Sequence, residues 1–115
     1  MKHKMNLHSE PFDLIQSGYK TIELRLNDEK RSMIHCGDII EFTNTSNPNK
    51  KIEVKVLKIH HFDSFEELYE SLPLDKCGYK LSKNSTAKAS DMLMYYPREK
   101  QDRYGVLGIE ILYYK

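Results

Sequence analysis

GYKTIELRL, residues 18–26, is the stretch that does most to decide how this chain folds. Its apolar residues occupy alternate positions, at Ile22, Leu24 and Leu26. The polar residues between and before them are Thr21, Glu23 and Arg25. Strict alternation over this length is typical of a β-strand with one face against a hydrophobic core. The stretch therefore predicts a strand over residues 20–26, with a polar, ionisable face on its other side.

The residues before this strand predict a short helix that ends where the strand begins. Ser9 is a residue type that caps helices, and Pro11 is favoured in the first helical turn. Apolar residues then recur at helical spacing until Gly18, a residue type that commonly ends helices in a left-handed conformation. We therefore expect a first strand within residues 3–8 and a helix from Ser9 to about Gly18.

Alternating apolar residues predict three further strands after this point, over residues 39–43, 52–62 and 104–113. The spacing slips between Val56 and Ile59, which predicts a β-bulge or bend near residues 57–58.

Two further helices are expected among these strands. Residues 64–67 form a capping box, which predicts a helix that ends before Pro73. Residues 73–88 are loop-like in composition, and a third helix is expected over residues 90–96. Residues 98–103 are interpreted as a charged turn.

About five strands and three short helices in 115 residues predict an α+β fold dominated by a β-barrel. A small mixed barrel with helices at its ends is the natural way to close so many strands in so short a chain. Residues 1–115 are expected to form a single domain, because the length suits one core and no linker or repeat interrupts the chain.

Composition narrows the function classes without selecting one. The chain has 18 basic and 17 acidic residues, so its net charge of +1 neither favours nor excludes nucleic acid. No window approaches the roughly 18 apolar residues of a membrane span, and no signal peptide is recognisable. Cys36 and Cys77 lack CxxC spacing and are expected to be reduced. We therefore expect a cytoplasmic protein without membrane contact.

No metal or cofactor is expected. His60 and His61 are adjacent on a predicted strand, so their side chains should point to opposite faces and cannot readily share one ion. No cysteine or carboxylate lies nearby with the spacing of a zinc site.

Ionisable residues are concentrated at the start of the strand over residues 20–26. Alternate strand residues lie about 6.6–7 Å apart, so Glu23 and Arg25 can pair directly or hold one ligand between them. Lys20 stands at the mouth of the strand, directly after the expected helix. Spacing alone leaves two interpretations open: an ion pair on an outward strand face, which contributes little stability, or a site for a polar ligand.

Several motifs together resemble the activating signal cointegrator homology (ASCH) domain, a family of the PUA-like superfamily. In chain order they are Gly18-x-Lys20-Thr21-Ile22-Glu23-x-Arg25, Gly37-Asp38-Ile39-Ile40-x-Phe42, Ile52-x-Val54-x-Val56 and Tyr104-Gly105-Val106-x-Gly108-Ile109. The resemblance spans nearly the whole chain and implies a small β-barrel with a cleft beside the first helix that binds RNA or nucleotides.

Two groups of residues are expected in this cleft. Charged and hydrogen-bonding side chains would hold a phosphate or a base edge, and tyrosines would stack on splayed bases. The expected ligand-binding residues are Lys20, Thr21, Glu23, Arg25, His8, Tyr19 and Tyr95. Tyr96 is a further candidate for stacking, although its helical spacing from Met92 and Leu93 favours a core role, and the oligomeric state is left open.

A bacterial amidohydrolase that deacetylates N4-acetylcytidine is one branch that the chain also resembles. Its catalytic Lys and Arg match Lys20 and Arg25, but Glu23 stands where that branch has Thr. Residues 80–90 contain no carboxylate where that branch has a catalytic Glu. If the chain is an enzyme acting on an acylated nucleoside, Lys20 and Glu23 are the candidate catalytic residues. We favour binding of RNA, a nucleotide or a nucleoside over catalysis, because binding needs fewer matching groups.

Overall fold

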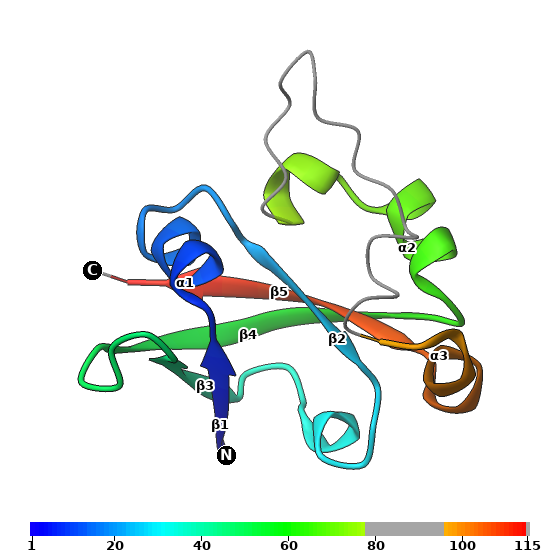
Figure 1. Ribbon diagram of the computed structural model, residues 1–115, viewed down its shortest axis with the longest axis horizontal. Helices are drawn as coiled ribbons and strands as arrows, with labels where there is room; N and C mark the ends of the chain where they lie inside the picture. The colour runs from blue at the N-terminus through cyan, green and yellow to red at the C-terminus, as the bar shows by residue number, and fades with distance from the viewer. Residues whose placement is uncertain (78–95, 115) are drawn as a thin grey trace.

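Five strands form one curled sheet in the order β1-β3-β4-β5-β2 (Figure 1). The computed structural model describes residues 1–77 and 96–114. The strands are β1 (Lys2–Leu7), β2 (Ile22–Leu26), β3 (Ile39–Asn44), β4 (Lys51–Phe62) and β5 (Val106–Tyr113). β1 pairs parallel with β3, and the remaining neighbours pair antiparallel. The predicted α+β fold with a barrel-like sheet is confirmed, in the form of a half-barrel whose edges are β1 and β2.

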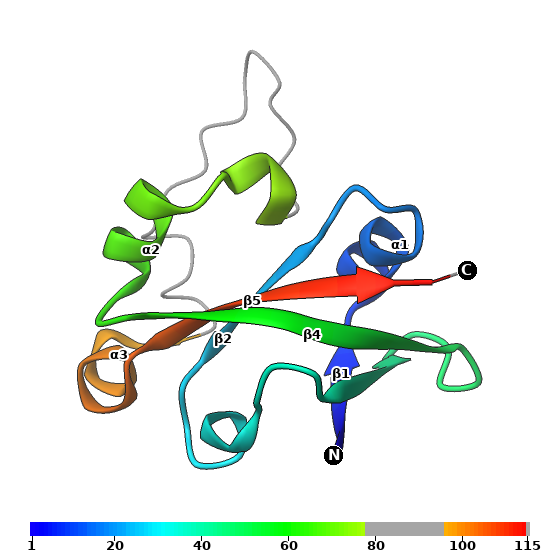
Figure 2. The same cartoon turned by 180° about the vertical axis from the view of Figure 1, so that it is seen from behind.

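The long strand β4 runs through the middle of the sheet and bends where the sequence indicated. Its pairing with β5 shifts register between Val56 and Lys58, which confirms the bulge expected near residues 57–58. A bulge increases local twist and bends the strand, and this helps the sheet to curl. Figure 2 shows β4 and β5 crossing the molecule side by side from the opposite viewpoint.

Within residues 1–77 and 96–114, three helices accompany the sheet: α1 (Ser9–Gln16), α2 (Phe65–Ser71) and α3 (Arg98–Tyr104). Two 3-10 turns are also present, η1 (Arg31–Met33) and η2 (Leu74–Cys77). The interpretation of residues 98–103 as a turn was wrong, because they form α3. The Arg, Glu and Lys residues of this segment are good helix formers and lie on an exposed face, while Gln101 is the buried residue of this helix. Apart from Tyr96, the helix expected over residues 90–96 lies outside the described residues.

The end of α1 determines where β2 begins. Gly18 has φ +89°, a conformation that glycine adopts without steric cost. Its N–H donates to the carbonyl of Ile15, and the N–H of Tyr19 donates to that of Leu14. This is the Schellman arrangement that commonly ends helices. It reverses the chain sharply, so that Lys20 lies at the junction of α1 and β2, as the glycine predicted.

The start of α1 differs from the expectation. His8 is the N-cap residue, and no side chain caps the helix. Ser9 is already helical, and its hydroxyl donates instead to the Asn44 side chain at 3.1 Å. This bond joins α1 to the end of β3.

Two apolar clusters hold the elements together. In the first, Phe12 and Ile15 of α1 pack on side chains from β1, β3, β4 and β5. In the second, Phe65 and Leu68 of α2 pack on β2 and Val106. Gly108 of β5 permits this packing, because a Cβ there would lie 2.5 Å from a methyl group of Leu72.

Candidate functional site: a buried ion triplet beside the first helix

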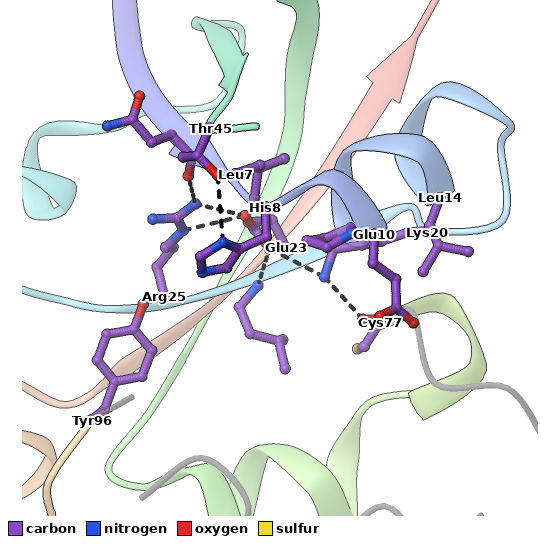
Figure 3. Close-up of a pocket in the computed structure, with 13 residues that line it drawn as sticks. Leu7, His8, Glu10, Leu14, Lys20, Glu23, Arg25, Thr45, Cys77 and Tyr96 are labelled. Carbon is purple, nitrogen blue, oxygen red and sulfur yellow. Dashed lines mark hydrogen bonds and ion pairs between the residues drawn. The ribbon is translucent and has the colours of Figure 1, made fainter. Parts of the chain in front are cut away.

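A cavity of about 680 Å³ lies beside α1, between the two edge strands of the half-barrel. Its lining in the described part of the chain combines polar and apolar residues from β1, α1, β2 and η2 (Figure 3). They are Asn6, Leu7, His8, Glu10, Pro11, Leu14, Lys20, Glu23, Leu24, Arg25, Thr45, Cys77 and Tyr96. The cavity has the size of typical small-molecule sites, about 300–1,000 Å³.

Lys20, Glu23 and Arg25 meet in this cavity as an ion triplet. The Lys20 ammonium lies 3.1 Å from Oε1 of Glu23. The Arg25 guanidinium donates to Oε2 of Glu23 from Nε at 3.2 Å and from Nη2 at 2.9 Å. Figure 3 shows the carboxylate of Glu23 between the two cations. The ion triplet, as we call these three residues below, carries a net charge of +1.

The ion triplet is buried, whereas an ion pair on an outward strand face would be exposed to solvent. Glu23 is 4% exposed and Lys20 is 8% exposed. The cause is the curl of the sheet, which turns this face of β2 toward β1 and α1. Nη2 of Arg25 donates across the gap to the carbonyl oxygen of Asn6 on β1, at 2.8 Å. Arg25 therefore connects the two edges of the sheet.

The two cations hold Glu23 in its ionised form. Burial acts to raise the pKa of the Glu23 carboxyl, but the charges of Lys20 and Arg25 outweigh burial and place this pKa below its ordinary value. Burial likewise acts to lower the pKa of Arg25, and the Glu23 carboxylate overcompensates and raises it. The opposite charges thus stabilise one another at a site where all three side chains are at most 12% exposed.

The hydrogen-bonding capacity of Glu23 is fully used within the protein. Oε1 accepts from Lys20 and from the N–H of Leu24, the latter at 3.2 Å. Oε2 accepts from two nitrogens of Arg25. A carboxylate offers about four acceptor positions, two on each oxygen. Glu23 can accept from a further group only if one of these bonds breaks.

Lys20 and Thr21 also fasten the turn η2 to β2. The Lys20 ammonium donates to the carbonyl oxygen of Cys77 at 3.0 Å, and the N–H of Thr21 donates to that of Lys76 at 2.8 Å. The composition of the sequence indicated only a loop here. The contacts of this loop with Lys20 and Thr21 could not be predicted, because backbone carbonyls carry no sequence signal. Burial raises the pKa of the Cys77 thiol to about 11, so this thiol stays protonated near neutral pH.

The other residues expected in the cleft are placed differently from one another. His8 lines the cavity, and its Nδ1 lies 3.4 Å from the Thr45 hydroxyl. Thr21 and Tyr19 are not among the lining residues, and Tyr19 is 75% exposed. Tyr95 lies outside the described residues.

Tyr96 lines the cavity although the sequence indicated a core role. Its ring stacks on Phe65 with centroids 5.5 Å apart, and burial raises the pKa of its hydroxyl. The buried Gln101 fixes this pair: its Nε2 donates to the Tyr96 carbonyl and its Oε1 accepts from the Phe65 N–H. The expectation of core packing was half right, because one side of the ring packs inward. The proximity of Tyr96 to Arg25 depends on tertiary structure and had no sequence signal.

Neither a metal site nor a membrane helix is evident in the described residues. Within residues 1–77 and 96–114, no three His, Cys, Asp or Glu side chains are grouped so that they could hold a metal ion. His60 instead lies 2.8 Å from Glu110. In the same ranges, no helix is both long enough and apolar enough to cross a membrane.

The curled mixed sheet, the helix before β2 and the cavity with its buried ion triplet define a small half-barrel domain with a cleft beside its first helix. A family model described as ASCH domain matches residues 5–114, and the chain belongs to this family. No curated protein matches the chain significantly.

Solved structures of similar proteins share this fold. The crystal structure of hypothetical protein PH0355 is 33% identical with a TM-score of 0.80, over 99% of this chain and 100% of that one. The solution structure of protein PF0455 from Pyrococcus furiosus is also 33% identical, with a TM-score of 0.74 over 100% and 99% of the two chains. An ASCH protein from Zymomonas mobilis shares the fold at 15% identity, with a TM-score of 0.66 over 96% of this chain and 66% of that one.

Proposed function

We propose that this ASCH domain binds RNA or a nucleotide and holds it in the cavity lined by Lys20, Glu23 and Arg25. The observation that carries the proposal is the convergence of these three charged side chains in one concave site beside α1. A surface ion pair would lie on a flat or convex exterior, whereas this triplet is buried at the wall of a cavity large enough for a nucleotide unit.

The lining offers the two kinds of contact that nucleotides need. Arg25 and Lys20 can donate to phosphate oxygens or to acceptors on a base edge. Tyr96, Leu14 and Leu24 supply aromatic and apolar surface for the faces of a base or sugar. In this proposal the protein works in the cytoplasm as a single domain spanning residues 1–115, as its sequence suggests.

A titration with short single-stranded RNA and with nucleotides tests the proposal. Binding can be followed by amide chemical-shift changes, which also locate the site. Perturbations should cluster at β2, the start of α1 and η2, and Lys20→Ala should abolish them. Lys55→Ala is the matched control, because Lys55 is an exposed lysine of β4 outside the cavity. Perturbations confined to other surfaces, or equal binding by both variants, would overturn the proposal.

Deacetylation of N4-acetylcytidine is the second candidate, favoured by the direct contact of Lys20 and Glu23 inside the cavity. The pKa of Glu23 lies below its ordinary value, which makes this carboxylate a weaker base. Its oxygens are also occupied by four donors. We therefore expect binding of the nucleoside without release of acetate. If the unmodified protein releases acetate and Lys20→Ala does not, the protein is a catalyst and the binding proposal is wrong.

A further inference from the structure

The contacts of the ion triplet indicate which chemical group of a ligand it can recognise. All four acceptor positions of Glu23 are taken by Lys20, Arg25 and the N–H of Leu24. A ligand amine would have to displace one of these four donors, three of which belong to charged groups. Charge-assisted hydrogen bonds of this kind are about twice as strong as neutral ones. Glu23 is therefore poorly placed to read donor groups on a ligand.

The cations, in contrast, retain donors that the described residues do not fill. An ammonium has three N–H groups, and in residues 1–77 and 96–114 that of Lys20 has acceptors at Glu23 and Cys77. A guanidinium has five N–H groups. Nε and Nη2 of Arg25 donate to Glu23 and Asn6, while Nη1 has no acceptor in these ranges. The ion triplet can therefore donate further hydrogen bonds to a ligand, but it has no free position to accept one.

The charge of the ion triplet favours the same kind of group. One carboxylate balances only one of the two cations, and the remaining positive charge is carried by side chains that are at most 12% exposed. An uncompensated charge in such a place attracts an anion more strongly than a surface charge does. Glu10 is the other acidic residue of the lining, but it is exposed on α1, where solvent screens it.

We propose that the site selects its ligand through a phosphoryl group, which accepts from Lys20 and Arg25, while Glu23 acts as a positioning residue that holds both cations in place. This inference rests on the proposed function and narrows it to nucleotides that present a phosphate to the ion triplet. Phosphate oxygens are acceptors and carry the negative charge that the ion triplet lacks.

Calorimetric titration of four nucleosides, their 5′- and 3′-monophosphates and inorganic phosphate tests this inference. The monophosphates should bind at least about tenfold more tightly than the nucleosides, as expected for hydrogen bonds to charged groups. Inorganic phosphate should bind more weakly than the nucleotides, because it leaves the apolar lining unfilled. Equal affinities for nucleoside and monophosphate would overturn the phosphoryl inference and leave nucleotide binding intact. Binding of none of these probes nor of RNA would overturn both.

Three variants test the assigned roles through the ratio of nucleotide to nucleoside affinity. Lys20→Gln should reduce the ratio toward one, and Lys55→Gln, at an exposed lysine of β4 outside the cavity, should preserve it. Glu23→Gln raises the net charge of the ion triplet to +2 but frees a cation from its position, so the ratio should fall. A partial loss of folded protein alone would lower the apparent affinities for nucleotide and nucleoside by the same factor and leave their ratio unchanged. A ratio that rises in Glu23→Gln would overturn the positioning role, because charge alone would then govern selection.

Discussion

Two groups of three charged residues in this protein have similar distances and very different surroundings. In the ion triplet, Glu23 lies 3.1 Å from Lys20 and 2.9 Å from Arg25, and all three side chains are at most 12% exposed. In a second group on the sheet surface, Lys2 lies 3.4 Å from Glu41 and 2.8 Å from Glu53, with Lys2 46% exposed. We call this second group the surface triplet. The distances do not distinguish the two triplets, but burial does. Solvent screens the charges of the surface triplet, whereas the charges of the ion triplet are stabilised mainly by one another.

The largest effect should come from removing the central carboxylate of the ion triplet. Glu23→Ala leaves two buried cations facing each other, and breaking a buried pair typically costs about 3–5 kcal/mol. We expect a loss of that order in the free energy of unfolding measured by urea denaturation. Glu53→Ala in the surface triplet is the matched control and should leave the midpoint nearly unchanged. Equal losses in the two variants would contradict the comparison.

A smaller loss is expected when one cation of the ion triplet is removed. Lys20→Ala leaves Glu23 paired with Arg25 but deprives the Cys77 carbonyl of its donor, at a cost of about 2 kcal/mol. Since Lys20 fastens η2 to β2, the neighbouring Thr21 amide, which donates to Lys76, should exchange its hydrogen faster. Hydrogen exchange measured by NMR gives this readout. Unchanged Thr21 protection would show that Lys20 does not hold η2.

Acid should weaken the ion triplet in a defined pH range. Because the folded-state pKa of Glu23 lies below its ordinary value of 4.5, its contribution is complete above about pH 4.5. The contribution is lost as the pH falls through the lower folded-state value. Glu23→Gln should therefore make the fall in stability below about pH 4.5 shallower. A remaining slope is expected from Asp38, whose pKa is also lowered, chiefly by its hydrogen bond with His3. An unchanged slope in Glu23→Gln would contradict the shift.

The smallest effect is expected in the surface triplet. Lys2→Ala should not measurably change the urea midpoint, because exposed ion pairs contribute little and are screened by salt. Any difference from the unmodified chain at low ionic strength should vanish at about 1 M salt, where the Debye length is about 3 Å. A difference that persists at high salt would place this lysine in a less exposed environment than described.

The local course of the backbone could be predicted from the sequence. Alternation at Ile22, Leu24 and Leu26 indicated β2, and Gly18 indicated the end of α1. The slip after Val56 indicated the bulge in β4. Each of these signals resides in residues close together in the chain, where steric preference and side-chain period determine the outcome.

The surroundings of the site could not be predicted in the same way. Glu23 and Arg25 have the spacing of a solvent-facing strand, and only the curl of the sheet brings Asn6 and α1 over them. The partner of Lys20 on η2 is a backbone carbonyl, which any residue at position 77 would provide. The charges of residues 98–103 suit both a turn and an exposed helix, and the burial of Gln101 became evident only in the structure.

The bond from Arg25 to Asn6 makes one side chain part of two structures. Its guanidinium belongs to the wall of the cavity and also bridges β1 and β2, the two edge strands between which the half-barrel remains open. Ligand recognition and the architecture of the sheet therefore share a component and cannot vary independently at this position. A change of affinity in an Arg25 variant can therefore be interpreted only together with a measurement of how stably β1 and β2 are held together.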